Sequence, residues 1–188
     1  MANGRFTLSF CRSRARVLML RRSRPPFAGL WNGLGGKVKP GETDDAGALR
    51  ELWEEAGIRR EDIARLVRIG DVSWEISRGD RAPSRGSMAV YLADLVDGWE
   101  SWQRARGTPE GELAWWPEGA LRDRGEPLIV ANIPHFYPAM LDDDGLAEYH
   151  CRYEGSRLLS VERRLDGSRQ LRYLAPTEAS GRRTPPDG

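Results

Sequence analysis

The chain is organised around the stretch Gly36–Ile58, GKVKPGETDDAGALRELWEEAGI. Its second half places three carboxylates, Glu51, Glu54 and Glu55, at the spacing i, i+3, i+4. At about 100° of rotation per residue, a helix gathers these carboxylates within an arc of about 100°. We predict that the opposite face is apolar and packs on the core, and that it consists of Ala46, Leu49, Leu52, Trp53 and Ala56.

The acidic face has two interpretations. Three exposed like charges at this spacing repel one another by a few tenths of a kcal/mol per pair, roughly. A divalent cation among them would offset that repulsion, because Mg²⁺ and Mn²⁺ prefer hard oxygen ligands. The same pattern also occurs on a surface helix whose acidic face is simply solvated, with a glycine-rich turn before it.

The residues on either side of the helix indicate where it begins and ends. Asn32–Gly36 is a loop whose glycines allow positive φ and a close approach of the backbone. Lys39-Pro40-Gly41 is typical of a turn. We expect Thr43 to be the N-cap and Gly57 to adopt the left-handed conformation just past the helix.

The stretch resembles the Nudix box at every defining position: Gly36, five residues, Glu42, seven residues, and then Arg50–Ile58. The resemblance implies an α/β fold, the Nudix α/β/α sandwich with a mixed β-sheet, whose box loop and helix span residues 36–58. It also implies metal-dependent hydrolysis of a diphosphate linkage, with one to three Mg²⁺ ions, or Mn²⁺, as the cofactor.

The family resemblance assigns roles to individual residues of the box. In the family the glutamates of this core bind the metal, and they correspond here to Glu51, Glu54 and Glu55. The backbone carbonyl of the first box glycine, here Gly36, is a further ligand in many members. Arg50 precedes Glu54 by four residues, where it can orient a carboxylate or offset the crowded charge.

Family members often take another acidic ligand or base from a later loop. Glu112 is our candidate because it directly precedes the aromatic strand Leu113–Trp116, and Glu110 is its rival. The general base is Glu51 or Glu112, since members of the family differ. Glu42, at the start of the box, is expected to have a structural role.

A weaker resemblance, over most of residues 5–165, is to the 8-oxo-dGTP diphosphatase branch of the family. It is carried by the run Trp31–Val38, the segment Phe136-Tyr137-Pro138 and the terminal hairpin Glu148–Leu165. By this resemblance Asn32 binds the base, and an amide suits a purine edge because it offers a donor and an acceptor.

Other candidate substrate-binding residues follow from the same resemblance and from charge. Phe27 and Trp74 correspond to pocket aromatics and could stack on a base, although ordinary core packing is the other interpretation of both. Arg22, in an arginine cluster before the glycine loop, is a candidate to hold phosphate, or else marks an exposed strand end. Lys37, inside the loop, is a further substrate-binding candidate.

The chain departs from that branch at one place. The branch carries Trp-Pro-Asp-Asp before the aromatic-proline segment, and its two aspartates read the oxidised purine. Here the comparable run is Val130-Ala131-Asn132-Ile133. Asn132 is a candidate to replace one of the hydrogen bonds, but the acidic pair is absent, so an ordinary or differently modified nucleotide is also a plausible substrate.

Hydrophobic patterning predicts the elements outside the box. We expect a first hairpin with an amphipathic strand and then a buried one, a pair of strands joined by a polar loop, a helix interrupted or initiated near Pro138, and a terminal hairpin. Their ranges are Phe6–Phe10 and Arg16–Arg21, Leu66–Ile76 and Ser87–Leu95 with the loop Ser77–Arg85, Ile133–Leu141, and Glu148–Tyr153 with Arg157–Arg164.

Composition narrows the class of protein. The 188 residues are 39% hydrophobic and 30% charged, which predicts one globular domain, 1–174, and a disordered tail, 175–188, with little to bury. The net charge of +1 does not favour a nucleic-acid or membrane partner. Cys11 and Cys151 are too few for a disulfide scaffold and indicate reduced thiols in a cytoplasmic protein. No stretch approaches about 20 apolar residues, and no signal-peptide core is present.

The sequence leaves three alternative functions for this protein. The first is hydrolysis of a nucleoside triphosphate to the monophosphate and pyrophosphate by a monomer or homodimer whose partner is a small nucleotide. The second keeps the chemistry but acts on ADP-ribose, a dinucleotide polyphosphate or RNA 5′ ends. The third is a nucleotide-sensing module without catalysis, which would be expected to lose box glutamates, whereas all are present.

Overall fold

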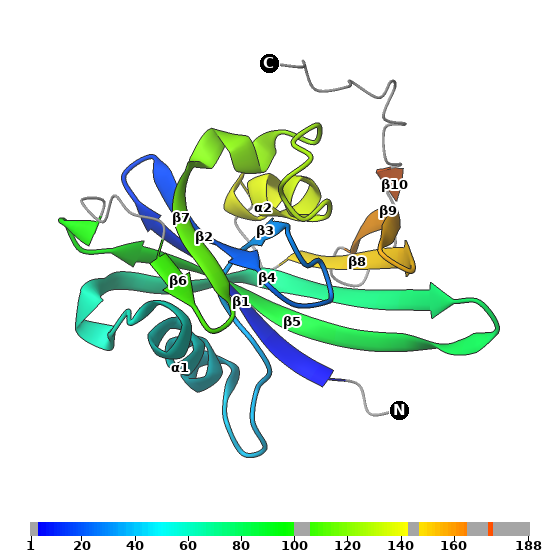
Figure 1. The fold of residues 1–188 in the computed structure, drawn as a ribbon, viewed down its shortest axis with the longest axis horizontal. Helices are drawn as coiled ribbons and strands as arrows, with labels where there is room; N and C mark the ends of the chain where they lie inside the picture. Colours follow the sequence, from blue (N-terminus) through cyan, green and yellow to red (C-terminus); the bar gives the residue numbers. More distant parts are fainter. Residues whose placement is uncertain (1–3, 100–105, 143–146, 165–172, 175–188) are drawn as a thin grey trace.

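The computed structural model describes residues 4–99, 106–142, 147–164 and 173–174, and shows a mixed sheet with a helix on each face (Figure 1). Within these residues, ten strands take part in the sheet, in the order β10-β9-β8-β4-β5-β1-β2-β7-β6, with β3 paired to β2. The predicted α/β/α sandwich is therefore confirmed. The elements are β1 Gly4–Ser13, β2 Arg16–Arg22, β3 Trp31–Asn32, α1 Asp44–Ala56, η1 Arg60–Asp62, β4 Ile63–Arg78, β5 Arg81–Leu95, β6 Arg106–Thr108, β7 Gly111–Pro117, η3 Glu118–Arg122, α2 Ile133–Asp142, β8 Ala147–Glu154, β9 Arg157–Arg164 and β10 Tyr173–Leu174.

Strand β1 lies in the middle of the sheet and is not the amphipathic strand that its sequence suggested. It pairs in parallel with β5 on one side and antiparallel with β2 on the other. Because helices cover both faces here, the polar side chains of Thr7 and Ser9 are as buried as Leu8 and Phe10. Alternation of polar and apolar residues therefore does not mark a solvent-exposed face in this strand.

Helix α1 has the ends predicted for it. The Thr43 hydroxyl accepts a hydrogen bond from the Ala46 backbone N–H at 3.2 Å, and Gly57 adopts φ 70° just past the last turn. These contacts satisfy backbone groups that a helix end leaves without partners.

The predicted apolar face of α1 is confirmed for Leu52 and Ala56, which are buried, and for Leu49, which packs against them, but it is wrong for the other two residues. Ala46 is exposed and Trp53 is 51% exposed, whereas Glu51 and Glu55 are buried beside Leu52. The reason is that the helix packs its acidic side against the glycine loop before it, which brings two of the three carboxylates inward. Only Glu54 of the three is exposed.

The β4–β5 hairpin is longer than predicted. The expected polar loop Ser77–Arg85 is almost wholly strand, with a turn only at Gly79 and Asp80. Polar residues are tolerated there because the end of this hairpin projects from the rest of the molecule (Figure 1).

Helix α2 covers the other face of the sheet, and the β8–β9 hairpin extends the sheet beyond β4. The helix runs without a break through Pro138, so the predicted interruption does not occur. Strand β8 pairs in parallel with β4, which sets Cys151 beside Trp74 and Tyr153 beside Ile76. The predicted tail, 175–188, lies outside the described residues. Among the described helices, none has the length and apolar character needed to cross a bilayer.

Candidate functional site

The glycine loop runs alongside the start of β1. The Thr7 N–H donates to the Gly36 carbonyl at 2.9 Å, and Ser9 and Leu34 exchange backbone hydrogen bonds at 2.6 and 2.9 Å. At Gly35, φ is 147° and a Cβ would lie 2.2 Å from the Thr7 carbonyl oxygen, so only glycine fits. The loop is thus fixed against the sheet with its other side facing α1.

Glu55 is the most deeply buried carboxylate of the box. Its Oε2 accepts a hydrogen bond from the Gly35 N–H at 2.7 Å, while its Oε1 has no partner among the described residues. Burial raises the pKa of Glu55 to about 8, and the nearby charges of Glu110 and Glu51 add to the rise. This carboxylate is therefore held close to other acids with one oxygen unused.

Glu51 lies against Gly36. A Cβ on that glycine would come within 2.6 Å of the Glu51 carboxylate, so the absence of a side chain makes room for the acid. The Glu51 Oε1 accepts a hydrogen bond from Arg50 Nη1 at 2.6 Å. The Gly36 carbonyl oxygen, a predicted metal ligand, already accepts from Thr7 but retains a second lone pair.

Arg50 connects the acids of the box. It bonds both oxygens of Glu42, at 2.8 and 2.9 Å, and also Glu54 at 2.9 Å and the Lys37 carbonyl at 3.0 Å. Its guanidinium holds the pKa of Glu42 at about 2, and Glu42 also accepts from the Lys39 N–H. Arg50 and Glu42 thus fasten the loop to α1, in agreement with the structural role expected for Glu42.

The donor set around the loop fits a divalent cation. In the part of the chain that the structure describes, no three acidic, histidine or cysteine side chains already stand as a ligand cluster, since Glu51 and Glu54 turn toward Arg50. The raised pKa of Glu55 nevertheless shows that its ionised form is unfavourable in this buried position, and its Oε1 has no hydrogen-bond partner among the described residues, so a cation would stabilise the carboxylate. Hard carboxylate and carbonyl oxygens are what Mg²⁺ and Mn²⁺ bind.

The later acid that faces this cluster is Glu110 and not Glu112. Glu110 lies next to Glu55, and its backbone carbonyl is held by the Ser23 N–H and hydroxyl at 2.9 and 2.8 Å. Glu112 is paired with Arg21 across the β2–β7 ladder and lies outside the pocket. The geometry therefore favours Glu110, the rival candidate, over Glu112 as the later acid.

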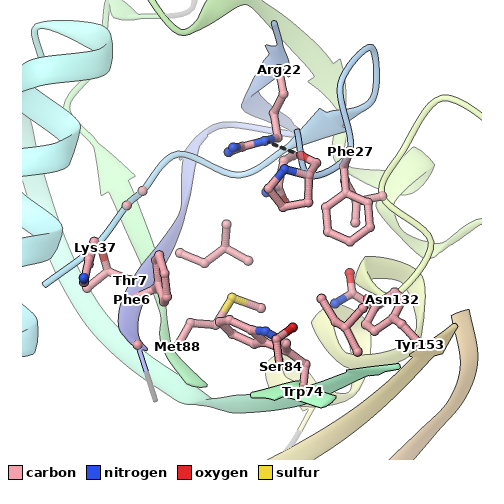
Figure 2. A pocket seen from close by; sticks show the side chains of 18 of the residues that line it. Phe6, Thr7, Arg22, Phe27, Lys37, Trp74, Ser84, Met88, Asn132 and Tyr153 are labelled. Carbon is pink, nitrogen blue, oxygen red and sulfur yellow. Dashed lines mark hydrogen bonds between the residues drawn. The ribbon is translucent and has the colours of Figure 1, made fainter. Parts of the chain in front are cut away.

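A pocket with a volume of 490 Å³ opens beside the loop, and its wall includes Gly35, Gly36, Lys37 and Glu110. All six predicted substrate-binding residues line it: Arg22, Phe27, Asn32, Lys37, Trp74 and Asn132. Lys37 lies on one side with the loop, and Asn132 lies on the opposite side (Figure 2). The pocket thus has a charged end near the acidic helix and a neutral end far from it.

The predicted residues are held in place by segments that lie far apart in the sequence. Asn32 is held by β3, whose Trp31 bonds Leu128 and Val130 through its backbone at 2.7 and 3.0 Å. This contact brings the segment before α2, with Asn132, to the same pocket. Arg22 extends over the pocket, and its Nε donates to the Pro26 carbonyl at 2.9 Å (Figure 2).

Some lining residues were not predicted from the sequence. Phe6, Met88 and Tyr153 come from three strands and line the pocket, with Phe6 on the side of Lys37 and Tyr153 on the side of Asn132 (Figure 2). Gly86 makes room for the indole of Trp74, because a Cβ there would lie 2.4 Å from the ring. The alternation of β8 marks Tyr153 as buried, but only its nonlocal pairing with β4 shows which cavity it faces.

Comparison with known proteins identifies the family of the chain. The family model for the NUDIX domain matches residues 4–138. The oxidized purine nucleoside triphosphate hydrolase of Mus musculus is 38% identical over 93 residues, which are 50% of this chain and 56% of the relative. The protein of the same name from Danio rerio is 45% identical over 60 residues, 32% of this chain and 36% of the relative. The aligned part of the chain thus spans about a third to a half of these relatives' length.

A solved structure shows the same fold. The MutT mutator protein from Bacillus halodurans superposes with a TM-score of 0.64 at 25% identity, over 88% of this chain and 99% of that one. Because the NUDIX model covers well over half of the residues, the chain belongs to the Nudix family.

Proposed function

We propose that this protein hydrolyses purine nucleoside triphosphates to the monophosphate and pyrophosphate, with a divalent cation at the acidic face of α1. The observation that supports the proposal most directly is the contact between the pocket and the acidic face of α1. The pocket wall at Gly35 and Gly36 has buried Glu55 and Glu51 directly behind it. A nucleotide with its base in the pocket would therefore place its phosphates beside these acids.

The side chains of the pocket supply binding and orientation. Lys37 is exposed at the charged end, where an ammonium group can bind phosphate oxygens, and Arg22 lies above the cavity. Phe27 and Trp74 offer ring faces to a base. These contacts would hold the diphosphate linkage in one orientation, which is a large part of what phosphoryl transfer requires.

The acidic cluster supplies the cation site. Glu51, Glu54, Glu55 and the Gly36 carbonyl would hold the metal, and we assign the later acid to Glu110. A bound divalent cation neutralises charge on phosphoryl oxygens and lowers the pKa of a bound water. Arg50 keeps Glu51 and Glu54 close to the loop, and the general base is drawn from the same group of carboxylates.

The choice of a purine is supported by the named function of the relatives and by the aromatic pocket. The two aspartates expected for an oxidised purine are absent, and Asn132 stands in their region. We infer that recognition is not restricted to 8-oxo-purines.

The test is Mg²⁺-dependent release of pyrophosphate and of phosphate from dGTP, 8-oxo-dGTP, dATP and dCTP, with formation of AMP from ADP-ribose followed alongside. We expect pyrophosphate from the purine triphosphates, and no release when EDTA is present. A marked preference for 8-oxo-dGTP over dGTP would contradict the inference about substrate range. Hydrolysis of ADP-ribose alone would show that the substrate class is wrong, and silence on all five would favour the sensing module.

A further inference from the structure

The turn between β6 and β7 carries Glu110 to the acidic cluster, although little of that turn is buried. Pro109 and Glu110 are both exposed, and Glu110 directly precedes the first residue of β7. An exposed turn is not fixed by packing, so polar contacts determine where it lies. The position of Glu110 next to Glu55 therefore depends on the hydrogen bonds that hold the Glu110 backbone.

Ser23, at the end of β2, makes two of these hydrogen bonds. Its backbone N–H and its hydroxyl both donate to the Glu110 carbonyl oxygen, at 2.9 and 2.8 Å. The pairing of β2 with β7 ends at Arg22 and Gly111, so the two bonds extend this contact by one residue on each side. Ser23 thus holds the carbonyl side of Glu110 against the end of β2.

The other side of Glu110 is held within its own turn. The Thr108 hydroxyl accepts hydrogen bonds from the N–H groups of Glu110 and Gly111, at 3.3 and 3.2 Å. At Gly111, φ is 154° and a Cβ would lie 1.9 Å from the Arg21 carbonyl oxygen, so a glycine is needed for this close approach to β2. The Glu110 backbone is therefore fixed on both sides.

Ser23 itself lies beside a closed loop. The chain leaves β2 at Ser23 and returns at Leu30, whose carbonyl accepts from the Arg22 N–H at 3.0 Å. The Gly29 N–H donates to the Arg22 carbonyl at 2.8 Å. Because these bonds close the loop next to Ser23, the backbone of Ser23 has little freedom to move away from Glu110.

We propose that Ser23 is a positioning residue, whose hydroxyl and N–H hold Glu110 beside Glu55 and so complete the acidic cluster for the cation. The proposal rests on the proposed function, in which Glu110 is the later acid of that cluster. Groups that support a metal ligand fix its direction, and their loss weakens metal binding or activity. Ser23 does not line the pocket, so it acts through Glu110 and not on the nucleotide.

The experiment is a double-mutant cycle on the full chain, with Mn²⁺ affinity measured by electron paramagnetic resonance in the absence of nucleotide. Ser23→Ala removes the hydroxyl bond and leaves the N–H bond, so we expect the affinity to fall by about 3- to 10-fold. In Glu110→Gln the same change should have an effect of less than about twofold, because no carboxylate remains to be positioned. Ser23→Thr keeps the hydroxyl and should bind Mn²⁺ as wild type does. Ser156→Ala, on an exposed turn outside the pocket, is the control and should do the same.

Wild-type affinity of Ser23→Ala for Mn²⁺ would overturn the proposal, as would a loss in Ser23→Thr as large as that in Ser23→Ala. An equal loss with and without the Glu110 carboxylate would also overturn it, since a purely structural role gives that result. Mn²⁺ binding needs no turnover, so the cycle is independent of the substrate assay. The expected cycle in a protein that releases no pyrophosphate from purine triphosphates would contradict the proposed function and not the assignment of Ser23.

Discussion

At the scale of single residues, the proposed cation site depends on which carboxylates face one another. Glu55 is buried with one free oxygen, and its neighbours are acids from two other places in the chain, Glu51 one turn earlier and Glu110 on a distant loop. Like charges brought together without cations are unfavourable, so proteins keep such arrangements mainly where they serve a function. The pattern points to a cation and not to surface solvation.

This arrangement gives a test that separates two glutamates on one short segment. Glu110→Gln should lower kcat about 10- to 100-fold, the usual effect of changing a residue that supports a metal site. Glu112→Gln is the control, since Glu112 is half-buried, lies outside the pocket and is paired with Arg21, and its kcat should stay close to that of wild type. Both kcat values are measured by steady-state kinetics with the purine triphosphate that the wild type hydrolyses fastest. A larger loss of kcat in Glu112→Gln than in Glu110→Gln would show that Glu112 is the later acid.

At the scale of secondary structure, α1 shows how a helix can bury apolar and acidic side chains on the same face. Leu52 is fully buried, whereas Trp53 is half exposed, with the Arg59 guanidinium 5.2 Å from its ring centroid. Leu52 packs against the sheet beneath α1, and Glu51 and Glu55 contact the glycine loop. The helix thus anchors the fold and presents the acids with the same side.

Truncating these two neighbours should therefore have unequal effects. Leu52→Ala is expected to lower the free energy of unfolding by about 2–5 kcal/mol, because it leaves a cavity in the core. Trp53→Ala should lower it by less than about 1 kcal/mol, as for an exposed cation–π pair. Urea denaturation measures both. A loss for Trp53→Ala as large as that for Leu52→Ala would show that Trp53 packs on the core, as the sequence predicted.

The loop that faces α1 offers a second test at this scale. In Gly36→Ala the added methyl group would meet the Glu51 carboxylate, the mobile end of a side chain, so the fold should survive while the acid moves. We expect kcat/KM to fall by about 100-fold, since a misplacement of about 1 Å can have that effect. Gly119→Ala, where nothing lies within 4 Å of the new Cβ, should retain activity. Full activity of Gly36→Ala would contradict the contact.

At the scale of the whole molecule, the sequence predicted the local features and missed the nonlocal ones. The helix caps, the turn at Lys39-Pro40-Gly41 and the β8–β9 hairpin follow from spacing and residue type within a few positions, and the structure contains them. The buried state of Thr7 and the pairing of β4 with β8 depend on segments tens of residues apart. No local pattern specifies such pairings, and for that reason Tyr153 was missed and Glu110 ranked below Glu112.

A further whole-molecule property is the sensitivity of folding to acid. His135, in α2, is buried, and burial lowers its pKa to about 4, with a smaller contribution from Arg124. The unfolded chain binds a proton near pH 6.5, so the contribution of His135 to stability is fully present above that pH and is lost as the pH falls toward 4.

Between pH 7.5 and 5.0 this one group should lower the free energy of unfolding by at most about 2 kcal/mol. His135→Phe, which cannot take up a proton, should show a correspondingly smaller decrease, with the response of His150 common to both proteins. Urea denaturation at the two pH values gives the comparison. An identical decrease in both proteins would show that His135 is not the source.

We propose that the acidic side of α1, with its loop, binds a divalent cation beside the nucleotide pocket. Mn²⁺ binding by electron paramagnetic resonance, in wild type and in Glu55→Gln, tests it most directly because it requires no substrate and no turnover. The account predicts Mn²⁺ binding to wild type and an affinity at least about tenfold weaker in Glu55→Gln, as for loss of a metal-site residue. Equal Mn²⁺ affinity in the two proteins would contradict it.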